Sequence, residues 1–319
     1  MSVSAMSCLQ SVCRRRVVVL LLMCTAVMVA VVWRSLVWSD DYKLETLVAQ
    51  LEEFGPERGY YDFTVVTGLF DIGRGHRLFR SRTYKTYLAW LIQILTLDVN
   101  LIVFIEPQGM DFVRRIRRGR EGRTLVVETN LSDLPYFKDM DRIQIVMNSQ
   151  QFQSDNVNWQ KGKIEATDPL YIMVTNCKAG LMGRAIQLNH FYSHYWIWLD
   201  AGLTHGNLSM FPPDGVWHPR HLLQDPDHVT FTAFQPMEQL VNVTDLHKRD
   251  TAPLAGGVFA GGTKTMLRYV QLHDQAWEEM LRSHAVDDDQ TTFTLAYLKH
   301  PGNFNPIIGG WFDLIRPWT

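Results

Sequence analysis

Short apolar runs alternate with amphipathic segments along residues 60–319. Four of these runs are continuous and rich in β-forming residues, a pattern that is typical of strands in a sheet. They occupy residues 62–68, 100–106, 124–128 and 195–199. Between the first two, Tyr84 to Leu95 carries apolar residues at helical spacing, so the order strand, helix, strand predicts a parallel crossover. We therefore expect one α/β domain with a Rossmann-like, mixed but mostly parallel sheet and flanking helices.

The rest of the domain is less regular. Further helices are predicted over 111–118, 179–191 and 263–281, and a further strand over 229–234. Residues 129–170 are polar, and the pattern assigns no element to them. The paired glycines between Gly256 and Gly262 indicate a turn, after which Thr263 is expected to cap the last of these helices.

The N-terminus has the pattern of a signal anchor. Three arginines, ending at Arg16, precede an uncharged apolar run over 17–33, which lacks the small-residue site of a cleavable signal peptide. The positive charges predict a cytosolic tail over 1–16, a transmembrane span over 17–33, a stem over 34–59 and a lumenal domain over 60–319. Because short spans sort to thinner membranes, we expect a single-pass type II protein of the Golgi membrane.

Other sequence features fit a lumenal domain. Acceptor triplets for N-glycosylation begin at Asn130, Asn207 and Asn242. Of the four cysteines only Cys177 falls in the predicted lumenal part, so no disulfide is expected within it. The formal net charge of -2 gives no sign of nucleic-acid binding.

One carboxylate has a position that suggests chemistry. Asp200 directly follows the apolar run at 195–199, and ligands of open α/β sheets collect beyond the carboxyl ends of the strands. An aspartate there suits a divalent cation or a ribose hydroxyl, although the same residue type also caps ordinary turns.

Four other features carry alternative interpretations. The glycine pairs around Gly256 and Gly261 either let a backbone approach a ligand or simply form a turn. The adjacent carboxylates of 287–289 indicate a cation or proton-transfer site, or else a solvated helix N-terminus. Lys178, expected at the head of a helix, either reaches a pyrophosphate or is a surface lysine. The arginines of 114–123 bind an anionic acceptor or form a solvated helix face.

Taken in order, these clusters resemble a known family. The segments that carry the likeness are Val66–Arg74, Asn176–Lys178, Trp198–Gly202, Gly256–Gly262 and Asp288–Gln290. They resemble the HtrL/YibB-type family of glycosyltransferase-like proteins and, more broadly, nucleotide-sugar-dependent transferases of the GT-A fold. The likeness covers most of residues 60–319.

The resemblance implies roles for particular residues. It places Thr67, Gly68, Asp71 and Arg74 beside the nucleotide, Lys178 at the pyrophosphate, and Gly256, Gly257 and Gly261 along the donor sugar and acceptor. Asp200 corresponds to the strand-end Asp-x-Asp motif that holds Mn²⁺ or Mg²⁺, but only one aspartate of that pair is present. Asp289, or its neighbour Asp288, corresponds to the base of inverting enzymes.

The resemblance also implies an activity. It leads us to expect a membrane-anchored glycosyltransferase that moves a sugar from a nucleotide-diphosphate donor to a hydroxyl of a glycan or glycoprotein, by an inverting route. The alternative is a GT-A-like domain that has lost catalysis and serves as a binding or partner subunit. The missing second aspartate favours that alternative.

Overall fold

The computed structural model describes residues 63–76, 82–207, 209–240, 245–249 and 252–316. Its strands are β1 (Phe63–Leu69), β2 (Asn100–Ile105), β3 (Thr124–Glu128), β4 (Tyr195–Leu199), β5 (Val229–Ala233), β6 (Leu254–Gly262) and β7 (Phe304–Ile308). Within the described residues they form one seven-stranded sheet in the order β3-β2-β1-β4-β6-β5-β7. Only β6 runs antiparallel to its neighbours in this sheet. The predicted mixed, mostly parallel α/β fold is therefore confirmed.

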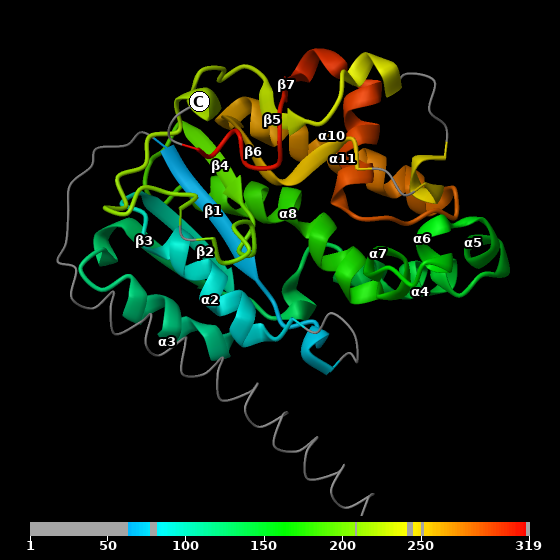
Figure 1. The fold of residues 1–319 in the computed structure, drawn as a ribbon, viewed down its shortest axis with the longest axis horizontal. Helices are drawn as coiled ribbons and strands as arrows, with labels where there is room; N and C mark the ends of the chain where they lie inside the picture. Colours follow the sequence, from blue (N-terminus) through cyan, green and yellow to red (C-terminus); the bar gives the residue numbers. More distant parts are fainter. Residues whose placement is uncertain (1–62, 77–81, 208, 241–244, 250–251, 317–319) are drawn as a thin grey trace, which may run out of the picture. The chain divides into compact units, whose positions relative to one another are not determined.

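The helices pack around this sheet. They are α2 (Tyr84–Leu95), α3 (Pro107–Ile116), α4 (Met140–Met147), α5 (Gln150–Asp155), α6 (Val157–Gln160), α7 (Ile164–Thr167), α8 (Pro169–Leu188), α9 (Arg220–Leu223), α10 (Thr263–Arg282) and α11 (Asp289–Lys299). In Figure 1, α2 and α3 lie together beside β1 to β3, and α10 and α11 lie together beside β5 to β7. Helix α8 contacts β1 and β4 as well as α10 and α11, so it connects the two halves.

The order of the strands creates a crevice. The chain passes from β1 to β2 and β3 on one side, and then returns through α8 to β4 on the other side of β1. Strands β1 and β4 pair in parallel, so their carboxyl ends lie next to each other. In open α/β sheets this reversal of direction is where ligands bind.

Helix α8 begins at Pro169, earlier than the predicted start at residue 179. Asp168 caps it, because its side chain accepts hydrogen bonds from the backbone N–H groups of Leu170 and Tyr171. The proline at the first helical position is a normal part of such a start. As a result Lys178 lies in the middle of a long helix, and the prediction that it heads one was wrong.

The glycine-rich stretch is a strand and not a turn. Every residue of β6 is buried between β4 and β5. The small residues are needed because neighbours approach the backbone: a Cβ on Gly262 would lie 2.6 Å from the carbonyl oxygen of Pro226. Gly262, not Thr263, is the cap of α10, and the Thr263 hydroxyl instead accepts a hydrogen bond from the Trp196 indole at 3.0 Å.

The arginine run is not wholly a solvated helix face. Arg117 is 1% exposed and donates hydrogen bonds to the carbonyls of Leu95, Leu97 and Val99, which end α2 and lead into β2. Its side chain therefore satisfies backbone groups that would otherwise be buried without partners. Arg118, by contrast, is exposed.

The polar stretch that the sequence pattern left unassigned is partly helical, because residues 129–170 contain α4 to α7. The predicted tail, transmembrane span and stem, over 1–16, 17–33 and 34–59, lie outside the described residues. Across the part of the chain that the structure describes, no helix is both long enough and apolar enough to cross a bilayer.

Candidate functional site

A cavity of about 340 Å³ opens at the carboxyl ends of β1 and β4. The first turns after these strands line it, together with the start of β6, one side of α8 and the N-terminus of α11. Its volume lies at the lower end of the range for small-molecule sites, roughly 300–1,000 Å³.

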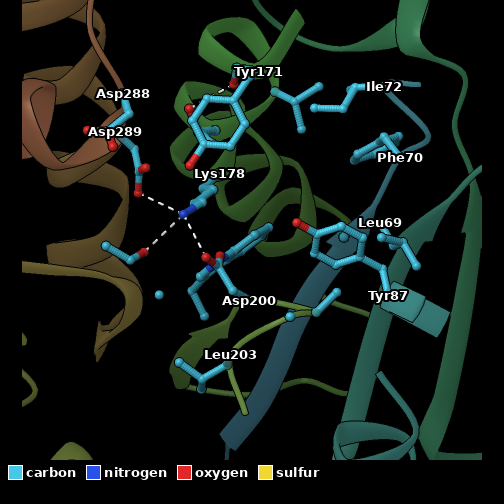
Figure 2. A pocket seen from close by; sticks show the side chains of 18 of the residues that line it. Leu69, Phe70, Ile72, Tyr87, Tyr171, Lys178, Asp200, Leu203, Asp288 and Asp289 are labelled. Atoms are coloured by element: carbon cyan, nitrogen blue, oxygen red, sulfur yellow. Dashed lines mark hydrogen bonds and ion pairs between the residues drawn. The ribbon is translucent and has the colours of Figure 1, made fainter. Parts of the chain in front are cut away.

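Lys178 occupies the centre of the polar wall of this cavity. Its ammonium nitrogen donates hydrogen bonds to Asp200 Oδ2 at 2.9 Å, to Asp289 Oδ2 at 2.7 Å and to the carbonyl oxygen of Gly256 at 3.2 Å (Figure 2). An ammonium group has three N–H donors, so all of them are used. Lys178 therefore ties α8, the end of β4, β6 and α11 together at one point.

Asp200 is held by its backbone and by both carboxylate oxygens. Its backbone N–H donates to the carbonyl oxygen of Gly257 at 2.9 Å, which continues the pairing of β4 with β6. Its Oδ1 accepts a hydrogen bond from the indole of Trp198 at 2.7 Å, while Oδ2 faces Lys178. The carboxylate is 31% exposed, so it lies at the cavity rim and not in bulk solvent.

Asp289 is the first residue of α11 and lies deeper, at 11% exposed. Asp288 caps the helix by accepting a hydrogen bond from the backbone N–H of Gln290 at 3.1 Å. The backbone of Gly256 passes directly against Asp289, since a Cβ there would lie 2.3 Å from Asp289 Oδ2. The glycine at this position is what allows β6 and α11 to come so close.

The surroundings shift the pKa values of Asp288 and Asp289 toward neutral. Burial raises the pKa of Asp289 to about 7, with Lys178 opposing the shift and Asp288 and Asp200 adding to it. Burial and the nearby Glu165 raise the pKa of Asp288 to about 6. Burial alone would lower the pKa of Lys178, but Asp200 and Asp289 raise it, so the ammonium stays charged. A carboxyl group that titrates near pH 7 suits a general base.

Another part of the cavity lining is aromatic and cationic. The guanidinium of Arg74 lies 5.9 Å from the ring centre of Tyr87 and 5.5 Å from that of Tyr171, and it donates a hydrogen bond to the Tyr87 hydroxyl. The guanidinium of Arg82 lies 5.2 Å from the ring of Trp90, and Arg82 also lines the cavity. Arg82 was not predicted as a site residue, because no motif surrounds it in the sequence.

The structure brings most of the predicted site residues to this cavity. Those that line it are Gly68, Arg74, Lys178, Asp200, Gly256, Gly257, Asp288 and Asp289. Segments predicted from distant parts of the sequence therefore meet at a single place.

Three predicted residues are not among those that line the cavity. Thr67 is fully buried within β1. Asp71 is exposed, and its backbone N–H donates to Glu106 at 2.6 Å. Gly261 pairs with Trp196 toward the other end of β6, because that strand is long and only its start reaches the crevice. Its placement corrects the prediction that both glycine pairs line one site.

The residues present do not fit a metal bound by Asp200. Both of its carboxylate oxygens already accept hydrogen bonds, one of them from an ammonium group at 2.9 Å. A divalent ion at its usual distance of about 2.0–2.2 Å from the same oxygen would face that positive charge directly. In residues 63–316, apart from the undescribed gaps, no three His, Cys, Asp or Glu side chains are grouped to share a metal.

Comparisons with known proteins place the chain in a family. The model of the HtrL_YibB family, described as a bacterial protein of unknown function, matches residues 61–319. Protein HtrL of Escherichia coli (strain K12) is 27% identical over 270 residues, covering 79% of this chain and 91% of that protein. The apo crystal structure of mouse xyloside xylosyltransferase 1 aligns with 78% of this chain and 85% of its own, at 13% identity and a TM-score of 0.36, which is too low to carry an argument. On the strength of the family match, this chain belongs to the HtrL/YibB family.

Proposed function

We propose that this protein is a glycosyltransferase with a GT-A-like domain, which moves a sugar from a nucleotide-diphosphate donor to a hydroxyl of a glycan or glycoprotein. One observation carries the proposal: Lys178, Asp200 and Asp289 meet in a cavity at the point where the strand order of the sheet reverses. That crevice is the usual ligand site of open α/β sheets, and the cluster provides both a cation and an acid with a shifted pKa.

The geometry supports an inverting route with Asp289 as the base. Lys178 holds Oδ2 of Asp289, so the acceptor hydroxyl approaches the other carboxylate oxygen. The acceptor oxygen forms a bond to the anomeric carbon as its proton passes to Asp289. The bond from that carbon to the donor diphosphate breaks, and its electron pair leaves with the diphosphate. Asp288 caps α11 and so positions the base.

We further propose a type II topology in the Golgi membrane, with the cavity in the lumen. The support for it is the arginine-flanked apolar run over 17–33 and the acceptor triplets at Asn130 and Asn207, both of which are exposed. In that compartment the acceptors are glycans and glycoproteins, and the donor is a nucleotide sugar.

The alternative is a catalytically inactive binding subunit, which the single strand-end aspartate favours. Turnover separates the two. Full-length protein, purified in detergent, is incubated with a panel of UDP- and GDP-sugars, and the released nucleoside diphosphate is measured. We expect release from at least one donor, and a loss of about 10²–10⁴-fold in kcat for Asp289→Asn with the donor affinity unchanged. Binding without turnover by the wild-type chain would establish the alternative.

A further inference from the structure

The group formed by Lys178, Asp200 and Asp289 does not present a net positive charge to a donor. Lys178 contributes one charge and contacts two carboxylates, and all three of its donors are used within the protein. A diphosphate that approached Asp200 and Asp289 without other compensation would meet like charges. The cations that bind it must therefore lie elsewhere in the cavity.

Arg74 and Arg82 meet this requirement. Both line the cavity, and within the described residues neither forms an ion pair with a carboxylate. Arg74 uses one donor on the hydroxyl of Tyr87, while its Nε is buried without a hydrogen-bond partner in the described structure. A guanidinium has five N–H donors, so both side chains keep several for a ligand.

Aromatic rings hold these guanidinium groups in place. Arg74 lies between Tyr87 and Tyr171, and Arg82 lies against Trp90, whose ring in turn packs edge-on against that of Tyr87 at a centroid distance of 5.2 Å. A guanidinium held against aromatic rings still has N–H donors for phosphate oxygens, which it binds in pairs when its planar edge is free.

We propose that Arg74 and Arg82 bind the donor diphosphate, and that no divalent cation bridges the diphosphate to Asp200. Lys178 takes the place between the carboxylates that a metal would otherwise occupy, and the two arginines neutralise the charge that develops on the leaving diphosphate. This inference rests on the proposed function, because it concerns the donor of the same reaction.

Calorimetric titration of the full-length protein with UDP and with GDP tests the inference. Each is titrated in the presence of EDTA and, separately, of Mn²⁺. We expect at least one of the two to bind, with affinities that agree within about threefold in both buffers. Binding that requires Mn²⁺ would overturn the inference and leave glycosyl transfer standing. Failure of both diphosphates to bind in either buffer would instead contradict the proposed function.

Two variants of Arg82 test its part in the site. In EDTA, Arg82→Gln should weaken the binding of the diphosphate by about tenfold or more, and Arg82→Lys should recover part of the loss, because it keeps the charge without the fork. Arg268→Gln changes an exposed arginine on α10 that does not line the cavity, and it should bind like the wild-type protein. Equal affinity of Arg82→Gln and Arg268→Gln would remove Arg82 from the site.

Discussion

Replacing Lys178 with methionine removes the one cation that lies between Asp200 and Asp289. Methionine has a similar length, so the packing of α8 is retained while three hydrogen bonds are lost. Removing one partner of a buried ion pair costs about 3–5 kcal/mol. Because Asp200 is 31% exposed and water can solvate it, we expect a somewhat smaller cost, about 2–4 kcal/mol at pH 7.

The cost should depend on pH in a defined direction. In the wild-type protein the pKa of Asp289 is about 7, and Lys178 holds it below the value that burial alone would give. Without Lys178 this pKa rises, so above pH 7 the folded variant keeps a proton that the unfolded chain, with a pKa near 4, has lost. The stability of the variant therefore falls as the pH rises, by up to about 1.4 kcal/mol per pH unit, whereas this group gives the wild-type protein little slope between pH 7 and 8.

Urea denaturation of both proteins at pH 5.5, 7 and 8 measures this difference. We expect the gap in unfolding free energy to be about 1 kcal/mol larger at pH 8 than at pH 7. The rise of kcat with pH, which should follow the deprotonation of Asp289, should move to higher pH in the variant. Lys178→Arg, which keeps the charge, should show neither change. A gap that is the same at all three pH values would refute the assignment of Lys178 as the partner of an ionised Asp289.

Three further predictions concern other residues. Gly256→Ala should lower the unfolding free energy by about 1–3 kcal/mol and abolish turnover, because its Cβ would lie 2.3 Å from a carboxylate oxygen of Asp289. Gly122→Ala should do neither, because a Cβ on Gly122 has no neighbouring atom within 4 Å. Arg117→Met should destabilise the fold by about 3 kcal/mol, since three backbone carbonyls lose their donor, and Arg118→Met should leave the melting temperature unchanged. Treatment with an N-glycosidase should increase the electrophoretic mobility of protein made in animal cells, and Asn207→Gln should remove one glycan. An unchanged mobility of the wild-type chain would contradict the lumenal topology.

Much of the first half of the fold could be predicted because its signals are local. The bounds of α2 and β3 agree with the predicted ones, and the parallel pairing of β1 with β2 follows from the crossover between them. Hydrophobic spacing within a dozen residues carries that information.

The errors arise where a side-chain pattern and a backbone requirement disagree. The apolar, partly β-branched residues at the start of α8 hide a helix whose real signals are the cap at Asp168 and the proline after it. In β6 the glycines contribute nothing to a hydrophobic pattern, yet the strand needs them, because Asp289 and Pro226 lie too close to its backbone for a Cβ. Asp289 and Pro226 are distant from these glycines in the sequence, so a local pattern does not reveal the requirement.

The site itself shows the same limit. Lys178, Asp200 and Asp289 were all predicted as site residues, but the contacts of Lys178 with the two acids were not. The lysine lies 22 and 111 residues away from them in the sequence, and no local pattern connects the three. Its position follows from the true length of α8, which places the lysine in a rigid helix directly behind the end of β4.

A lysine in this position has a consequence that a bound metal would not have. A metal that arrives with the diphosphate leaves its carboxylate ligands repelling each other until the donor binds, whereas a covalently attached ammonium holds them together in advance. In the proposed mechanism, Asp289, its helix cap and Asp200 are then fixed before a donor enters, and the donor has only to meet Arg74 and Arg82 in the same cavity. Such advance ordering lowers the free energy needed to organise the reacting groups during the reaction. In the proposed mechanism one strand-end aspartate is then sufficient, because Lys178 supplies the charge between the acids and a second ligand for a metal is not needed.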